Sequence, residues 1–265
     1  MKNIIFVSRL DNDCSIGAFL LCELALNLSD IYQDLTITIV GGGSEYQKIC
    51  SKALYINNKV GRKLINATGE MSNPSSCFQK GALFVGVSRA ALEAMAHGLC
   101  VILLGNEGYL GLLDESKLNT AIQTNFTCRG TAQPTLYDSF KAVFFDEIRR
   151  FFDLPENDKA RLSFLSQKTV QESYTAQKMA ENTVRFYIKA LKKYHSDCKS
   201  NFKKATFFSH PTHKKKKIAI CGYYGHKNLG DDTILSVICE IIRKNSKDKC
   251  QISALLKTSF IISYE

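Results

Sequence analysis

A short turn between an apolar run and an alanine-rich stretch holds the side chains best suited to phosphate chemistry. The run ends at Val85, passes through Gly86 and Ser88 and continues into Arg89, with Glu93 about one helical turn later. Free backbone amides at a helix start, together with the helix dipole, favour a bound phosphate. The dipole disfavours a cation in the first turn, so an anion beside Arg89 would explain its place, and Glu93 could accept hydrogen bonds from ribose hydroxyls. An ordinary amphipathic helix whose Arg and Glu face solvent fits the same spacing, which leaves both interpretations open.

A second glycine-containing loop follows an apolar run at 217–221. Its glycines permit tight turns and a close approach of the backbone to a ligand. A bound phosphate or carboxylate suits this loop, and a purely structural strand-to-helix turn suits it equally. The candidate ligand-binding residues of the loop are Gly222, Gly225, Asn228, Gly230 and Asp231.

Alternating strand and helix patterns surround the first of these turns. Apolar runs predict strands at 4–8, 35–40, 63–68, 82–86 and 99–104, with helices at 15–28, from Ser44 onward and from Ser88 to His97. Ser44 and Gln47 form a capping-box pattern, Ser88 is predicted to cap its helix, and Gly98 is predicted to end it. The alternation predicts a Rossmann-like α/β domain, in which helices cover both faces of a parallel sheet.

Ligands of such sheets bind at the carboxyl ends of the strands. The residues that stand out in this sequence follow those ends: Arg9, Gly41, Gly42, Gly43, Gly69, the turn from Gly86 to Arg89, and the stretch from Gly105 to Gly111. We therefore expect the functional site at this edge of the sheet.

Beyond residue 135 the pattern becomes helical, with helices predicted at 135–153, 156–172 and 175–194. These helices form a cap that ends a first domain, residues 1–194. A basic linker at 195–216 follows, and residues 217–265 begin a partial βαβ unit with strands at 217–221 and 250–255 and a helix at 233–244. The tail after Leu256 has no evident role in that unit. Because so short a unit cannot close a core or cover a sheet, we expect the chain to be a fragment of a longer fusion protein.

The formal charge of +10 is predicted to lie mainly in the linker. Residues 195–217 hold seven lysines against one acid, Asp197, and so carry +6. We expect a solvated basic tether here and not a basic folded face, with peripheral contact to the inner face of the membrane as the alternative. No aromatic–basic stripe or recognition module supports nucleic-acid binding.

The cysteine spacing and the lengths of the apolar runs restrict the class of protein further. The ten cysteines form no Cys-x-x-Cys pair and no zinc-finger spacing with histidine, so we expect reduced, structural thiols. No Ser/His/Asp or metal-ligand spacing assigns a catalytic residue, and no metal is expected. No apolar run approaches the roughly 18 residues that span a bilayer, and the N-terminus lacks a signal-peptide core. We expect a cytoplasmic protein.

Four motifs carry a family resemblance. They are Phe6-Val7-Ser8-Arg9-Leu10, Ile39-Val40-Gly41-Gly42-Gly43, Ala67-Thr68-Gly69 and Leu92-Glu93-Ala94-Met95-Ala96-His97-Gly98. Their strand, turn and helix residues resemble those of the C-terminal, donor-binding domain of retaining GT-B glycosyltransferases, over about residues 2–194. The resemblance implies a nucleotide-sugar donor, a diphosphate contact for Arg9 and a ribose contact for Glu93.

Two positions depart from that family. Its second glutamate, eight residues before the one at Glu93, corresponds to Val85, and a lysine about five residues after the arginine corresponds to Cys14. Arg89 is a candidate to replace the missing cation. The stretch 105–111 replaces the family's glycine-rich donor loop, where Glu107 and Gly108 are candidate donor contacts. These departures leave open a domain that binds the donor without transferring its sugar.

The second loop carries another resemblance. Gly222-Tyr223-Tyr224-Gly225 and Asn228-Leu229-Gly230-Asp231-Asp232 are similar to the opening of polysaccharide pyruvyl transferases, which move pyruvate from phosphoenolpyruvate onto cell-surface sugars. Together the resemblances imply a bacterial glycosyltransferase-type protein of surface-polysaccharide synthesis, fused to a pyruvyl transferase. Its expected partners are a nucleotide sugar, a saccharide or lipid-linked saccharide acceptor, and phosphoenolpyruvate for the second domain. The alternatives are a non-catalytic nucleotide-sugar module and a parent protein that acts chiefly as a pyruvyl transferase.

Overall fold

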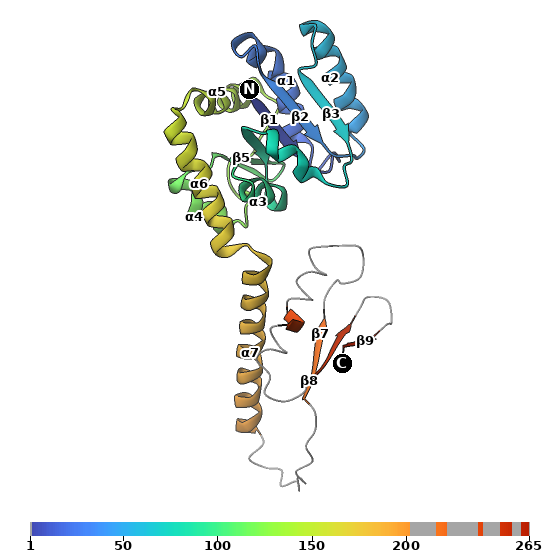
Figure 1. Cartoon of the computed structure of the whole chain (residues 1–265), viewed down its shortest axis with the longest axis vertical. Helices are drawn as coiled ribbons and strands as arrows, with labels where there is room; N and C mark the ends of the chain where they lie inside the picture. Colours follow the sequence, from blue (N-terminus) through green and yellow to red (C-terminus); the bar gives the residue numbers. More distant parts are fainter. Residues whose placement is uncertain (1, 202–215, 222–237, 241–249, 256–260, 265) are drawn as a thin grey trace. The chain divides into compact units, whose positions relative to one another are not determined.

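The computed structural model describes residues 2–201, 216–221, 238–240, 250–255 and 261–264. Contacts within the chain divide it into two units, Met1–Gln171 and Glu172–Glu265 (Figure 1). The predicted pyruvyl-transferase loop, with Gly222, Gly225, Asn228, Gly230 and Asp231, lies outside the described residues.

A six-stranded sheet organises the first unit (Figure 1). Its strands are β1 (Asn3–Val7), β2 (Thr36–Val40), β3 (Ile65–Gly69), β4 (Leu83–Gly86), β5 (Cys100–Gly105) and β6 (Gly108–Leu112). The strand order is β3-β2-β1-β4-β5-β6, and all neighbours pair in parallel except β5 and β6. This arrangement confirms the predicted Rossmann-like α/β fold. The order reverses between β1 and β4, which in such sheets opens a crevice at the carboxyl ends of these strands.

The helices of this unit pack on both faces of the sheet. They are α1 (Ile16–Ile31), α2 (Tyr46–Val60), α3 (Ser88–Ala96), α4 (Glu115–Gln123), α5 (Asp138–Asp153) and α6 (Glu156–Ser173), with a 3-10 helix, η1, at Pro74–Lys80. Phe6 and Val85 belong to the core cluster that also contains the buried residues of α1, α2 and α5. Successive strand residues point to opposite faces, and Phe84 packs edge-on against Phe78 of η1. Both faces of the central strands are therefore buried, as their unbroken apolar runs require.

Two predicted helix caps are wrong. Helix α2 starts at Tyr46 after Glu45, and Ser44 forms no capping box, because its backbone amide donates to the Asp11 carboxylate at 2.9 Å. Ser88 is the first residue of α3 and not its cap, since Val87 holds that position. Gly98, with φ of 81°, follows the end of α3 at Ala96, as predicted. The structure also contains η1 and α4, which the sequence patterns did not predict.

The second unit contains a long helix and a small sheet. Helix α7 spans Ala176–Asn201 and so continues past Tyr194, where a linker was expected to begin. Strand β7 (Lys216–Cys221) pairs in parallel with β8 (Cys250–Leu255). The tail adds a third strand, β9 (Ile261–Tyr264), antiparallel to β8. The expectation that this tail has no role in the unit is therefore wrong, because it satisfies the free edge of β8. No helix among the described residues is both long enough and apolar enough to cross a bilayer.

Candidate functional site

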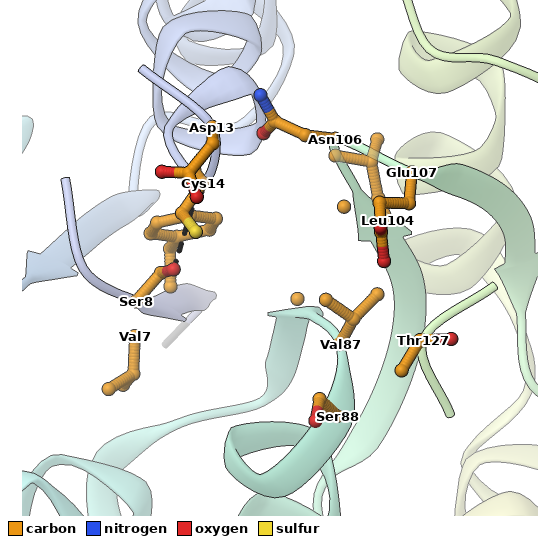
Figure 2. A pocket seen from close by; sticks show the side chains of 13 residues that line it. Val7, Ser8, Asp13, Cys14, Val87, Ser88, Leu104, Asn106, Glu107 and Thr127 are labelled. Atoms are coloured by element: carbon orange, nitrogen blue, oxygen red, sulfur yellow. Dashed lines mark hydrogen bonds between the residues drawn. The ribbon is translucent and has the colours of Figure 1, made fainter. Parts of the chain in front are cut away.

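A pocket of about 440 Å³ opens at the carboxyl ends of β1, β4 and β5 (Figure 2). It lies where the strand order reverses, at the place that the α/β topology favours for a ligand. Asp13 and Cys14 lie on one side of it, and Glu107 and Thr127 on the other. The main segments of its lining are Phe6–Ser8, Gly86–Ser88 and Leu104–Glu107. Of the predicted site residues, Gly86, Ser88 and Glu107 line this pocket.

The turn between β4 and α3 is short and conformationally unusual. Gly86 has φ of 153°, and Ser88 has φ of 59°, the left-handed region that side-chain-bearing residues rarely adopt. The Ser88 amide donates to the Phe126 carbonyl at 2.7 Å, which fixes the turn. The Ser88 amide is therefore already satisfied within the protein. The next two amides, those of Arg89 and Ala90, lie in the first turn of α3, where backbone amides are available to hydrogen-bond a ligand.

The predicted ribose and phosphate residues of α3 pair with each other. Arg89 Nε donates to Glu93 Oε1 at 3.1 Å, an i,i+4 ion pair between two exposed side chains. Neither residue lines the pocket, although their helix begins at it. Exposed pairs of this kind contribute about 0–1 kcal/mol, so a ligand can replace either partner at low cost. The ligand roles of both residues stay predictions.

Arg9 follows β1 on the opposite side of the crevice. Its guanidinium group lies 2.8 Å from Asp11 Oδ2, 3.5 Å from Asp13 Oδ2 and 3.5 Å from Cys14 Sγ. The Cys14 sulfur and then the two carboxylates raise the pKa of Arg9. Hydrogen bonding from the Ser44 amide, with the nearby Arg9 charge, lowers the pKa of Asp11. The diphosphate-binding candidate is thus exposed, charged and held by carboxylates.

The three glycines after β2 lie outside the pocket lining. A Cβ atom on Gly41 would lie 1.8 Å from the Ser8 carbonyl oxygen, and one on Gly43 would lie 2.5 Å from the Leu10 carbonyl carbon. Leu10 also donates to the Gly42 carbonyl at 2.7 Å. Close packing of the loops after β1 and β2 therefore explains these glycines without a ligand, and their donor role stays a prediction.

The stretch expected to replace a donor loop is instead a hairpin. Gly105 pairs with Gly108 across β5 and β6, which leaves Asn106 and Glu107 as the turn. Gly108 does not line the pocket, and a Cβ atom there would lie 1.8 Å from the Cys128 carbonyl oxygen. A two-residue turn is enough to join two antiparallel strands, so no long loop is present at this position.

Asn106 is a positioning residue that the sequence did not reveal. Its Oδ1 accepts from the Ile16 amide at 3.1 Å, and its Nδ2 donates to the Asn12 carbonyl at 2.9 Å. It thereby satisfies an amide at the start of α1 and ties the loop after β1 to the hairpin. These partners are far apart in the sequence, so no local pattern could have indicated the contact.

A second unpredicted segment borders the pocket after α4. Asn125, Phe126 and Cys128 all have positive φ, from 50° to 58°. Backbone strain of this kind is often found at functional sites. Thr127 lines the pocket, and Arg129 donates to both oxygens of Glu107 at 2.8 and 2.9 Å. The hydrogen bond to Glu107 raises the pKa of Arg129.

The two departures from the GT-B pattern occupy different environments. Val85 is fully buried in the core cluster on β4. Cys14 lines the pocket, and burial, with the nearby Asp13 carboxylate, raises the pKa of its thiol. The part of the chain that the structure describes contains no cluster of three or more His, Cys, Asp or Glu side chains that could hold a metal ion.

No family model and no curated protein matches this chain. Several solved structures are similar in fold at low identity. S. aureus TarM, solved with UDP, is 16% identical with a TM-score of 0.48, and the match covers 69% of this chain and 35% of TarM. A glycosyltransferase from Rickettsia africae is 15% identical with a TM-score of 0.49, over 72% of this chain and 48% of that protein.

A third similar structure is a single domain. It is the C-terminal domain of LpcC, a glycosyl transferase group 1 family protein from Francisella tularensis, at 15% identity and a TM-score of 0.46, over 66% of this chain and 86% of that domain. This chain thus spans about a third of the length of TarM and about half of that of the Rickettsia enzyme.

Proposed function

We propose that the first unit binds the nucleoside diphosphate part of a nucleotide sugar in the pocket at the ends of β1, β4 and β5. The observation that carries this proposal is the position of the pocket at the switch point of the sheet, with the start of α3 on its edge. The first-turn amides of α3 would receive a phosphate. Glu93, one turn further along this helix, would accept hydrogen bonds from the ribose hydroxyls.

Two arginines would hold the diphosphate by exchanging partners. Arg9 would leave Asp11 and Asp13, and Arg89 would leave Glu93, to contact phosphate oxygens. Each exposed ion pair contributes about 0–1 kcal/mol, whereas a hydrogen bond to a charged group contributes about 1.5–3 kcal/mol. The exchange is therefore favourable for a ligand that brings a diphosphate close to both side chains.

Sugar transfer is the activity that we propose for this site. Asp13 and Glu107 line the pocket from opposite sides, and their carboxylates would be the ones nearest to a bound donor sugar. The motifs around Arg9 and Glu93 support a donor-binding role of the GT-B type, in the synthesis of a cell-surface polysaccharide in the bacterial cytoplasm. A saccharide or lipid-linked saccharide would be the acceptor.

A non-catalytic binding module is the second candidate. The position of the family's second carboxylate is Val85, which is buried in the core and cannot face a donor. Cys14, in place of the lysine, gives the pocket an uncharged side chain at neutral pH. This candidate predicts nucleotide binding without any release of nucleotide from the sugar.

Titration calorimetry with UDP, GDP and CDP tests the binding site. We expect micromolar to millimolar affinity for at least one of them, and a loss of about tenfold or more in the Arg9→Gln/Arg89→Gln variant. Lys59→Gln/Lys63→Gln removes the same charge from exposed positions outside the pocket lining and should bind normally. Absence of binding for all three nucleotides at millimolar concentration would refute the site. Nucleotide release from the matching nucleotide sugar then separates the two candidate functions.

We propose the domain limits that the sequence suggests: a donor-binding domain at 1–194, a basic linker at 195–216 whose first seven residues continue helix α7, and the start of a pyruvyl transferase at 217–265. The last of these limits is supported by the resemblance of the loop at 222–232 and by the parallel pairing of β7 and β8, which precede and follow that loop in the sequence. Transfer of pyruvate from phosphoenolpyruvate to a saccharide tests the last of these. Limited proteolysis that leaves a stable core ending near Tyr194 would support the boundary, and a protected 217–265 piece would contradict it.

A further inference from the structure

Helix α7 separates basic and apolar side chains along its length. Lys178, Arg185, Lys189 and Lys192 recur at spacings of seven, four and three residues. Side chains at these spacings share one face of an α-helix. The four cations therefore form a basic stripe along α7.

Exposed apolar side chains occupy much of the rest of the α7 circumference, where the polar residues Glu181, Asn182 and Thr183 also lie. Met179 and Phe186, seven residues apart, lie on one line, and Tyr187 and Ile188 extend the apolar arc around the helix. The exposed fractions are 44% for Met179, 67% for Phe186, 37% for Tyr187 and 48% for Ile188. Every residue from Glu181 to Ala190, all of them described, is partly or fully exposed. Large apolar side chains grouped in this way on a protein surface indicate an interaction site.

The net charge of the protein belongs to the unit that contains this helix. Residues 1–171 hold 17 basic and 17 acidic side chains, whereas residues 172–265 hold 18 basic and 8 acidic ones. The whole formal charge of +10 therefore lies in the second unit. Part of it forms a folded basic face on α7, in addition to the lysines of the predicted linker at 195–216.

We propose that α7 is a membrane-surface helix that binds an anionic lipid bilayer. Its apolar arc, centred on Met179, Phe186 and Tyr187, enters the boundary between headgroups and acyl chains, and its basic stripe contacts anionic headgroups. A bilayer surface accepts both features at once, because a helix with Lys and Arg on one face and Phe on the other lies in the interface plane. Each cation near such a surface adds to the attraction, which acts on the basic unit and not on the neutral one. This inference does not depend on the nucleotide pocket.

The protein contains no tryptophan, which allows a direct test. Phe186→Trp places a single tryptophan on the apolar arc with a conservative change. In the full-length chain, vesicles of phosphatidylcholine with phosphatidylglycerol should shift its emission to the blue, and brominated acyl chains should quench it. Vesicles of phosphatidylcholine alone should give a much smaller effect. No shift with either vesicle, or a concentration-dependent shift without vesicles, would overturn the proposal, since the latter means that α7 contacts a second copy of the chain.

A charge variant separates α7 from the other lysines of the second unit. Vesicle sedimentation of the Arg185→Gln/Lys189→Gln variant should show binding weakened about tenfold or more. Lys59→Gln/Lys63→Gln removes two charges from the first unit and should sediment like the unmodified chain. Phe186→Ser, at an already exposed position, should also weaken sedimentation. Equal binding by all of these variants would assign any vesicle affinity to other lysines and would refute the role of α7.

Discussion

Replacement of Ser88 by glycine, and separately by alanine, tests whether the turn at the pocket stores backbone strain. Ser88 has φ of 59° at the start of α3, and its amide is fixed on the Phe126 carbonyl. Both variants lose the serine hydroxyl. They differ in the backbone, because only glycine adopts the left-handed region without a steric penalty.

The expected difference follows from two opposing contributions. An L-residue in the left-handed region loses about 1–2 kcal/mol, which the glycine variant recovers. Glycine also increases the entropy of the unfolded chain, which costs about 0.4–1 kcal/mol. We therefore expect Ser88→Gly to be more stable than Ser88→Ala by about 0.5–1 kcal/mol, or about 1–4 °C in melting temperature for a domain of this size.

Urea and thermal unfolding of the two variants measure this difference. Gly61→Ala calibrates it, because Gly61 has φ of 73° and a Cβ atom there would meet nothing within 4 Å. Gly61→Ala should therefore be less stable than the unmodified protein, by an amount similar to the difference between Ser88→Gly and Ser88→Ala. If Gly61→Ala shows its loss while Ser88→Gly is no more stable than Ser88→Ala, the strain assigned to Ser88 is absent.

Three further outcomes test the loops and side chains around the pocket. Glu93→Gln should weaken nucleoside diphosphate binding in calorimetry about tenfold or more with little change in melting temperature, and unchanged affinity would leave Glu93 as an ordinary solvent-facing residue. Alkylation of Cys14, measured against a Cys14→Ser control, should slow when nucleotide is bound. Because burial raises the pKa of this thiol, its rate should still be rising with pH above the usual range for cysteine, and a rate unaffected by nucleotide would place the ligand elsewhere. Gly41→Ala should cost about 3 kcal/mol or more in urea unfolding, since its Cβ atom would overlap the Ser8 carbonyl, and a cost as small as that of Gly61→Ala would refute this close packing.

The strands and the class of fold could be predicted because each central strand is an apolar run between polar or glycine-containing turns. The same criterion did not predict β6, because that strand contains glycines and is not an unbroken apolar run. Gly105, Gly108 and Gly111 make that stretch look like a loop, although Gly108 pairs with Gly105 across the hairpin and is closely approached by the Cys128 carbonyl of a distant segment. Local composition indicates how freely the backbone can bend, but it does not indicate which distant segment packs against a glycine.

The site was predictable only in part, since long-range contacts decide much of it. The sequence placed Gly86, Ser88 and Glu107 at the right edge of the sheet, where the pocket lies. Asn106 and Arg129 went unnoticed, because their roles depend on partners that other elements bring near. The functions of Arg9 and Glu93 stay predictions, as the structure shows each of them paired with a neighbouring side chain and not with a ligand.

The ion pairs around the pocket also determine which anions can occupy it. Three guanidinium groups, those of Arg9, Arg89 and Arg129, are matched by four carboxylates, those of Asp11, Asp13, Glu93 and Glu107. An empty mouth with this balance has no positive field to attract anions over a distance, so the association rate of a nucleotide should depend little on ionic strength. Inorganic phosphate and other small anions, which offer no ribose or base contacts to repay the displaced carboxylates, should compete poorly. The self-neutralised mouth would thereby distinguish a nucleotide from small inorganic anions.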